Sequence, residues 1–141
     1  MKMRRKARLA RSALWVGGML GVCGAAQAVE CNSLLSVTSD STTMTAADAV
    51  TAPGTVGGVA VAVPFCRVQG TARPSADSEI KFEVWLPPST TQWTGRMKVN
   101  GTGGYSGAIP YARLAQDVGD GFVSAGSNMG HDGGESATWT L

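Results

Sequence analysis

The sequence predicts an α/β fold, and three consecutive segments of its second half carry that prediction. Residues 96–100 have the pattern of a strand and run directly into a glycine-rich stretch, residues 101–107. Residues 110–118 repeat apolar side chains at helical spacing, and residues 121–126 have the composition of another strand. Strand, glycine loop, helix and strand in this order form a βαβ unit, whose two strands run parallel. We therefore expect a parallel sheet with the glycine loop at the carboxyl end of a strand.

The chain before this unit predicts fewer regular elements. Residues 80–86 alternate apolar and polar side chains, as a half-buried strand does, and two prolines follow them. Residues 59–63 alternate in the same way over a shorter length. The remainder of residues 29–65 is rich in Ser, Thr, Ala, Val and Gly, and residues 39–43 predict turns. We expect this part to be a leader segment that wraps onto a larger body.

The first 28 residues have the three parts of a cleavable secretory signal. Six basic residues come first, and an apolar run over 13–23 follows them. Ala26-Gln27-Ala28 then supplies the small-x-small pattern that precedes cleavage, here after Ala28. A membrane anchor is the alternative, but the apolar run is about half the usual spanning length. We expect a secreted or periplasmic protein with no stable membrane association after signal cleavage.

Removal of the signal changes the charge of the chain. The whole sequence has 12 basic and 10 acidic residues, and six of the basic ones lie before residue 12. The part from Val29 onwards therefore keeps 6 basic against 10 acidic residues, a formal net charge of −4. No cluster of Lys and Arg remains there to bind a phosphate backbone. The sequence excludes nucleic acid as a partner.

Two cysteines, Cys31 and Cys66, follow the predicted signal. An isolated pair in an oxidising compartment favours a disulfide. A metal site would need more ligands of this kind, and His131 is the one histidine of the chain. We therefore predict a Cys31–Cys66 disulfide and no metal site in this chain.

The glycine stretch 101–107 is the main candidate for a functional site. Ligands of α/β proteins bind at the carboxyl ends of parallel strands, and glycines let several backbone N–H groups point at one spot. That geometry suits a phosphate or an oxyanion hole for acyl transfer. The stretch lacks the Lys-Ser/Thr of a P-loop and the spacing of a dinucleotide loop, which disfavours phosphate. A purely structural turn remains the alternative.

Five short motifs in order resemble the amino-terminal part of the tannase and feruloyl esterase family. They are FCRVQG at 65–70, IKFEVWLP at 80–87, WTGR at 93–96, GTGGYSG at 101–107 and GH at 130–131. The resemblance covers about residues 66–139. Thr94, Thr102 and Asn128 stand where the family usually has Asn, Asn and Asp, which bears on fine specificity more than on fold.

The resemblance implies a secreted serine esterase with an α/β-hydrolase core. Members of the family cleave esters of hydroxylated aromatic acids through an acyl-enzyme, and a calcium ion commonly stabilises their lid. The chain then divides into a signal peptide (1–28), a Ser/Thr/Ala-rich leader (29–65) and the incomplete start of an α/β-hydrolase domain (66–141). The expected substrate is a small aromatic ester. The expected alternative is a secreted non-catalytic binding or structural module that reuses part of the fold.

The resemblance also implies roles for individual residues. Gly103 and Gly104, beside Thr102, would supply oxyanion-hole amides, and Tyr105 would line the acyl pocket. The Gly-His motif places His131 outside the catalytic triad, with its ring bonded to backbone. Ser106 and Ser127 are interpreted as turn residues, and Trp85, Trp93 and Trp139 as packing residues.

The triad itself is expected downstream of Leu141. The family's nucleophile lies in a Cys-Ser-x-Gly-Gly motif, and no such motif occurs in this sequence. The resemblance therefore predicts that these 141 residues are a fragment that is inactive alone, with calcium confined to the lid of the full-length protein.

Overall fold

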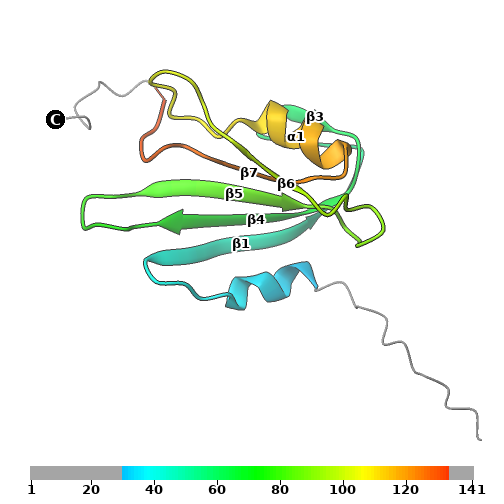
Figure 1. The fold of residues 1–141 in the computed structure, drawn as a ribbon, viewed down its shortest axis with the longest axis horizontal. Coiled ribbons are helices and arrows are strands. Elements are labelled where there is room, and N and C mark those ends of the chain that lie inside the picture. The colour runs from blue at the N-terminus through cyan, green and yellow to red at the C-terminus, as the bar shows by residue number, and fades with distance from the viewer. Residues whose placement is uncertain (1–29, 134–141) are drawn as a thin grey trace, which may run out of the picture.

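The computed structural model of the protein describes residues 30–133, and these form one main sheet, a small hairpin and two helices. The elements are the 3₁₀-helix η1 (Cys31–Ser36), β1 (Thr42–Val50), β2 (Gly54–Val56), β3 (Val59–Val61), β4 (Phe65–Ala72), β5 (Ile80–Leu86), β6 (Met97–Asn100), α1 (Tyr111–Gly119) and β7 (Val123–Ser127). The main sheet has the strand order β1-β4-β5-β7-β6, and β2 pairs with β3 (Figure 1).

The sheet is mixed, which corrects the expectation of a parallel sheet. Strands β6 and β7 are parallel and are joined through α1, so the predicted βαβ unit is confirmed. The pairs β1–β4, β4–β5 and β5–β7 are antiparallel. The reason lies in the connections: β4 and β5 are separated by seven residues, too few for a crossover between parallel strands.

The predicted elements agree with the structure to within a few residues. The strand at 80–86 is β5 with the same bounds, and the helix and strands of the βαβ unit are shifted by one to two residues. The short strand at 59–63 is β3, which ends at Val61. In the segment 39–43, Asp40 and Ser41 form a turn, but Thr42 already begins β1.

Strands β1 and β4 are not among the predicted elements. β1 pairs with β4 along almost its whole length, so the segment before residue 65 contributes the edge strand of the main sheet. This segment is therefore part of the sheet itself.

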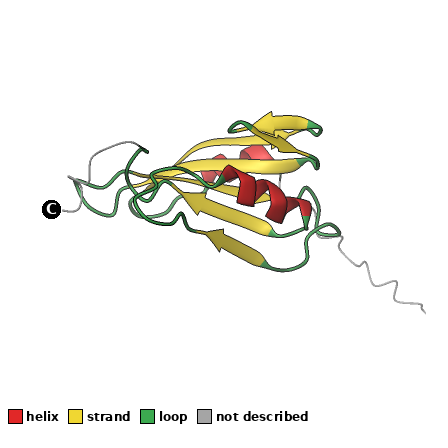
Figure 2. Ribbon diagram, turned by 90° about the horizontal axis from the view of Figure 1, so that it is seen from above, coloured by secondary structure: helices red, strands yellow, loops and turns green. Residues whose placement is uncertain are grey.

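One face of the sheet carries the core. The rings of Phe65 and Trp85 stack with centroids 4.2 Å apart, and both side chains are buried. Helix α1 lies over this face of the sheet (Figure 2), and its Leu114 and Val118 belong to the same buried cluster. The hairpin β2–β3 adds two more buried valines to the same cluster. This packing holds α1 directly against the sheet. It therefore fixes the point at which the segment from β6 enters the helix.

The 3₁₀-helix η1 packs mainly against β1, the edge strand of the main sheet. The predicted disulfide Cys31–Cys66 is present, with the two Cα atoms 5.5 Å apart, and it joins η1 to β4. Figure 1 shows η1 beside β1, at the edge of the sheet farthest from α1. At the other edge, Val99 of β6 is 76% exposed. No helix within residues 30–133 has the length and apolar character needed to cross a membrane.

Some of the expectations concern residues outside the described range. The signal peptide, its cleavage after Ala28 and the packing role of Trp139 all fall there.

Candidate functional site

The glycine loop, residues 101–107, lies at the carboxyl end of the parallel pair β6–β7. It follows Asn100, the last residue of β6, and faces the segment 128–133 that follows β7. Gly101, Gly103 and Gly104 are exposed, and a methyl group at any of them would meet open space. Gly104 has a φ of 64°, a conformation in which glycine is favoured. The middle of the loop therefore presents backbone to the surroundings without side chains in the way.

His131 holds the far part of the loop. Its side chain is nearly buried, at 5% exposure, and Nε2 lies 3.1 Å from the backbone oxygen of Tyr105. In the tautomer protonated at Nε2, the ring donates to this carbonyl. The sequence-based expectation that the ring bonds to backbone is confirmed.

Gly107 closes the same contact. Its carbonyl accepts a hydrogen bond from the N–H of Gly133 at 3.1 Å. A Cβ at this position would lie 2.4 Å from the carbonyl oxygen of His131, so the two backbones approach too closely for any side chain. The second half of the loop is thus fixed to the segment after β7.

Asn128 organises that segment. Its Oδ1 accepts hydrogen bonds from the N–H groups of Lys81 (2.9 Å) and Gly130 (3.0 Å), and its Nδ2 donates to Asp132 at 3.3 Å. The Asn128 side chain thus supplies the accepting oxygen on which the turn depends. Asp132 also pairs with Lys81 at 2.9 Å. The hydrogen bonds from Lys81 and then Asn128 lower the pKa of Asp132.

A cluster of polar side chains lies beneath the start of the loop. Asp117 of α1 accepts hydrogen bonds from Lys98 (2.8 Å, to Oδ1) and Asn100 (2.7 Å, to Oδ2). The hydroxyl of Ser124 in β7 donates to Asp117 Oδ2 at 3.0 Å and accepts from Asn100 at 3.0 Å. Asp117 is 6% exposed and Ser124 is fully buried. These residues therefore link β6, β7 and α1 at the point where the loop begins.

The cluster keeps Asp117 ionised. Burial, the largest single influence, raises the pKa of this carboxyl group, but the hydrogen bonds from Lys98, Asn100 and Ser124 together outweigh it and lower the pKa below its ordinary value. This cluster is not among the sequence-based predictions. One signal was available: a carboxylate near the carboxyl end of a helix is unfavourable for the helix dipole, and so indicates a partner elsewhere.

A second buried carboxylate lies under the amino end of α1. Glu83 of β5 is 1% exposed and accepts hydrogen bonds from Arg67, Gln69, Trp85 and Tyr111. Arg67 donates through Nε at 2.8 Å and through a second nitrogen, so this pair is bidentate. Glu83 thereby joins β4, β5 and the first residue of α1.

The neighbours of Glu83 respond to its charge. The pKa of Arg67 is raised, chiefly by its hydrogen bond to Glu83. The pKa of Tyr111 is raised above 10.0 first by burial and then by the negative charge of Glu83. Tyr111 therefore stays protonated at neutral pH and donates to the carboxylate at 2.9 Å.

Thr102 and Tyr105, the other two loop residues with predicted roles, differ in their contacts. The hydroxyl of Thr102 donates to the carbonyl of Ser106 at 2.9 Å, which closes the loop on itself. Tyr105 is 72% exposed, so within residues 30–133 its ring has little cover.

Ser127 is the last residue of β7, and its Oγ accepts a hydrogen bond from the N–H of Met129 at 3.3 Å. Trp85 packs in the core as expected, whereas Trp93 is 44% exposed.

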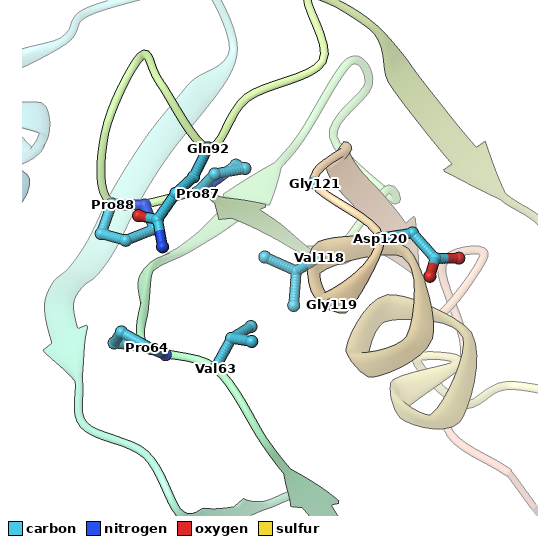
Figure 3. A pocket seen from close by; sticks show the side chains of 9 residues that line it. All are labelled: Val63, Pro64, Pro87, Pro88, Gln92, Val118, Gly119, Asp120 and Gly121. Carbon is cyan, nitrogen blue, oxygen red and sulfur yellow. The ribbon is translucent and has the colours of Figure 1, made fainter.

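Two cavities lie at the opposite end of the sheet from the loop. One, of about 210 Å³, is formed by proline-containing segments before β4 and after β5 together with the carboxyl end of α1. Figure 3 shows Val118 pointing into it, while the carboxylate of Asp120 points away. The other, of about 560 Å³, is mainly apolar and adjoins the disulfide, Leu34, Leu86 and Trp93. Neither cavity includes a residue of the glycine loop.

Residues 30–133 contain no group of three or more His, Cys, Asp or Glu side chains that could hold a metal ion. The described residues therefore do not fit a calcium site.

Comparison with known proteins finds sequence relatives that are named as esterases. An uncharacterized esterase of Xanthomonas campestris is 37% identical over 129 residues, which is 87% of this chain and 21% of that protein. A protein of Aspergillus flavus named "Probable feruloyl esterase B-2" is 40% identical over 79 residues, 56% of this chain and 15% of its own length. The chain thus spans about a fifth or less of these relatives.

Solved structures show the same fold. Feruloyl esterase B from Aspergillus oryzae matches 76% of this chain and 22% of its own, with a TM-score of 0.68 and 26% identity. An esterase from the same organism matches 73% of this chain and 22% of its own, with a TM-score of 0.63 and 31% identity. The family model described as tannase and feruloyl esterase matches residues 66–139, the residues that build most of the sheet, the glycine loop and its anchors. The chain belongs to the tannase and feruloyl esterase family.

Proposed function

We propose that this chain is the amino-terminal part of an exported carboxylic ester hydrolase that cleaves aryl esters such as ferulate or gallate esters. The single observation that carries the proposal is the glycine loop at the carboxyl end of β6, which is anchored at both ends and bare in the middle. Preorganised backbone N–H groups of this kind stabilise the oxyanion that forms during acyl transfer. Family membership supplies the reaction class, because the relatives are named as esterases.

The chemistry assigned to this chain is limited to the loop. The N–H groups of Gly103 and Gly104 would donate to the oxyanion of the tetrahedral intermediate, and Tyr105 would line the acyl pocket. The nucleophile, acid and base are assigned to sequence beyond Leu141, and so are the lid and its calcium ion. The supporting fact is that the chain spans about a fifth of its relatives.

The sheet offers a place for that further sequence. The outer edge of β6 carries no partner strand within residues 30–133. In a complete α/β-hydrolase core, another parallel strand would pair here, next to the glycine loop. Export by the predicted signal peptide would place the enzyme in the periplasm or outside the cell, where esters of aromatic acids are accessible.

The experiment compares the complete protein with residues 29–141 alone. Hydrolysis of methyl ferulate and methyl gallate is followed by chromatography. We expect turnover by the complete protein and none by the shorter chain. Absence of turnover of both esters by the folded complete protein would favour the alternative, a secreted binding or structural module.

A matched pair of variants tests the oxyanion role in the complete protein. Gly103→Pro removes one N–H donor, and Gly103→Ala keeps it, because a Cβ at this position meets open space. We expect a loss of kcat of about 10²–10³-fold for the proline variant and less than about threefold for alanine. Equal kcat values for the two variants would contradict the role of this amide.

A further inference from the structure

Asp117 stands at a position that a helix and a protein interior both disfavour. It is the third residue from the end of α1, where a negative charge opposes the helix dipole, and it is almost fully buried. A buried charge persists only where partners compensate its lost hydration. The partners of Asp117 therefore indicate what the residue does.

Those partners lie on β6 and β7, beside the start of the glycine loop. Both carboxylate oxygens are used, by Lys98 on one side and by Asn100 and Ser124 on the other. The ammonium group of Lys98 lies 4.0 Å from the centroid of the Phe122 ring, which holds Lys98 over the same helix end. Ser124, Asn100 and Asp117 form a closed set of three mutual hydrogen bonds.

Asn100 connects this cluster to the loop. It is the last residue of β6, pairs in register with Gly126 of β7, and is followed directly by Gly101. Its side chain is thus held by α1 and β7 while its backbone leads into the loop. Gly126 reinforces the arrangement: a Cβ there would lie 2.7 Å from Pro110, so α1 and β7 are in close contact.

We propose that Asp117 is a positioning residue for the oxyanion loop, acting through the side chain of Asn100. This rests on the proposed esterase function. The far half of the loop is tied to the segment after β7, and Asp117 fixes the near end against the helix, so that the amides between the two anchors keep one orientation. Asn100 and Ser124 transmit the constraint, and none of the three contacts substrate.

The test uses the complete protein and three variants. Asp117→Asn keeps the shape of the side chain but directs an N–H₂ group at donors. Val118→Ala is the matched control, because Val118 is a buried neighbour on the same helix that packs into the core away from the loop. The double variant Asn100→Asp with Asp117→Asn exchanges the carboxylate and the amide, and so keeps one acceptor and one donor in the pair.

Steady-state hydrolysis of methyl ferulate is measured first. A displaced catalytic group commonly costs about 10²-fold in rate, so for Asp117→Asn we expect kcat to fall about 10- to 100-fold with KM changed less than about twofold. Val118→Ala should keep kcat within about threefold of wild type even though its Tm falls. The exchange variant should recover part of the lost kcat. Equal kcat losses for Asp117→Asn and Val118→Ala would overturn the positioning role.

Hydrogen–deuterium exchange supplies a readout that does not depend on turnover. Peptides that cover residues 100–107 should exchange faster in Asp117→Asn than in Val118→Ala, at equal distance from each variant's Tm. Equal exchange in the two variants would overturn the proposal. If the wild-type protein hydrolyses neither ester, the proposed function fails, and the exchange measurement still decides whether Asp117 orders the loop.

Discussion

At the scale of single residues, two carboxylates, Glu83 and Asp117, are buried within residues 30–133. Glu83 accepts hydrogen bonds from four different side chains, and Asp117 accepts from three. Each therefore joins α1 to two strands of the sheet. Such a buried carboxylate stabilises the fold little more than apolar side chains of similar volume would. Its removal alone is nevertheless costly, because several buried donors then lose their acceptor.

Replacement of Glu83 by Gln should therefore be costly. The amide offers one accepting oxygen in place of two and directs its own donors at Arg67, so we expect the free energy of unfolding to fall by about 3 kcal/mol. Urea unfolding followed by tryptophan fluorescence measures the change. Glu79→Gln is the control, since the Glu79–Arg73 pair is exposed and worth less than about 1 kcal/mol. Similar losses for the two variants would contradict the account of Glu83.

The lowered pKa of Asp117 should make the stability of the protein depend on pH in the acidic range. The pKa of Asp117 is lower in the folded protein than its ordinary value of 3.8. The ionised form is thus favoured by folding, its contribution is present above about pH 4, and it is lost as the pH falls through the folded-state pKa. The Tm difference between wild type and Asp117→Asn should be constant from about pH 5 to 7 and should shrink below about pH 4.

The control for this titration is Val118→Ala, which removes no titratable group. Its Tm difference from wild type should not depend on pH over the same range. A difference for Asp117→Asn that stays constant down to about pH 2.5 would contradict the assignment of the acid-sensitive step to Asp117.

At the scale of elements, α1 is in close contact with β7 near its amino end and has open space at its carboxyl end. Gly126 in β7 lies against Pro110, directly before the helix, and leaves no room for a side chain. Gly119, the last residue of α1, is the opposite case on the same element, because a methyl group added there would have no neighbouring atom within 4 Å.

Alanine substitutions at these two glycines should change the free energy of unfolding in opposite directions. Gly126→Ala should push α1 away from β7 and lower the free energy of unfolding by about 1–3 kcal/mol. Gly119→Ala should raise it by up to about 1 kcal/mol, because alanine favours the helix. Urea midpoints of the two variants measure the contrast. Two stabilising substitutions, or two destabilising ones, would contradict the close seating of α1 on β7.

The disulfide acts on another element, η1. Cys31 and Cys66 close a loop of 35 residues, for which chain entropy predicts a stabilisation of about 3–4 kcal/mol. The double variant Cys31→Ser with Cys66→Ser should lose about this amount, and a reducing agent should lower the stability of wild type but not of the variant. Thermal unfolding with and without reducing agent measures both effects.

At the scale of the whole molecule, residues 30–133 cover one face of the sheet more completely than the other. Helix α1 and the hairpin β2–β3 pack on the first face, whereas η1 packs mainly against β1, at the edge of the sheet farthest from α1 (Figure 1). Val99 and Met97 of β6 are exposed, and the outer edge of β6 carries no strand within the described range. An exposed apolar strand at a sheet edge favours pairing between chains.

The chain of residues 29–141 should therefore self-associate in isolation. Val99→Lys places a charge on the exposed strand and should increase the monomer fraction, because edge lysines oppose strand pairing. Sedimentation velocity over a range of concentrations measures the distribution. Thr43→Lys at the opposite sheet edge, in β1, is the control and should change it less. A wild-type chain that stays monomeric throughout would contradict the prediction.

The accuracy of the sequence-based prediction differs between elements for physical reasons. The βαβ unit is predictable because its glycine loop, helix periodicity and flanking strands are all local features. Strand β4 escapes prediction because its buried face carries Arg67 and Gln69, which break the usual alternation of apolar and polar side chains. Strand β1 escapes it because its small and hydroxyl side chains become a strand through pairing with β4.

The candidate site divides in the same way. The glycine loop and the backbone-bonded role of His131 follow from short motifs, and the disulfide follows from the number of cysteines. Asp117, Ser124 and Asn100 could not be assigned as a cluster, since they come from three elements that are brought together only by folding.

The sequence by itself determined the family, the glycine loop, the βαβ unit and the disulfide, because each depends on residues that lie close together, on the number of cysteines or on a resemblance of ordered motifs. The tertiary structure decided which polar residues are buried and what they hold. An alternating strand pattern places Glu83 on the solvent side of β5, yet it is among the most buried residues of the chain. Three of its four hydrogen-bond partners come from β4 and α1, and their donors compensate the lost hydration only after these elements have packed together.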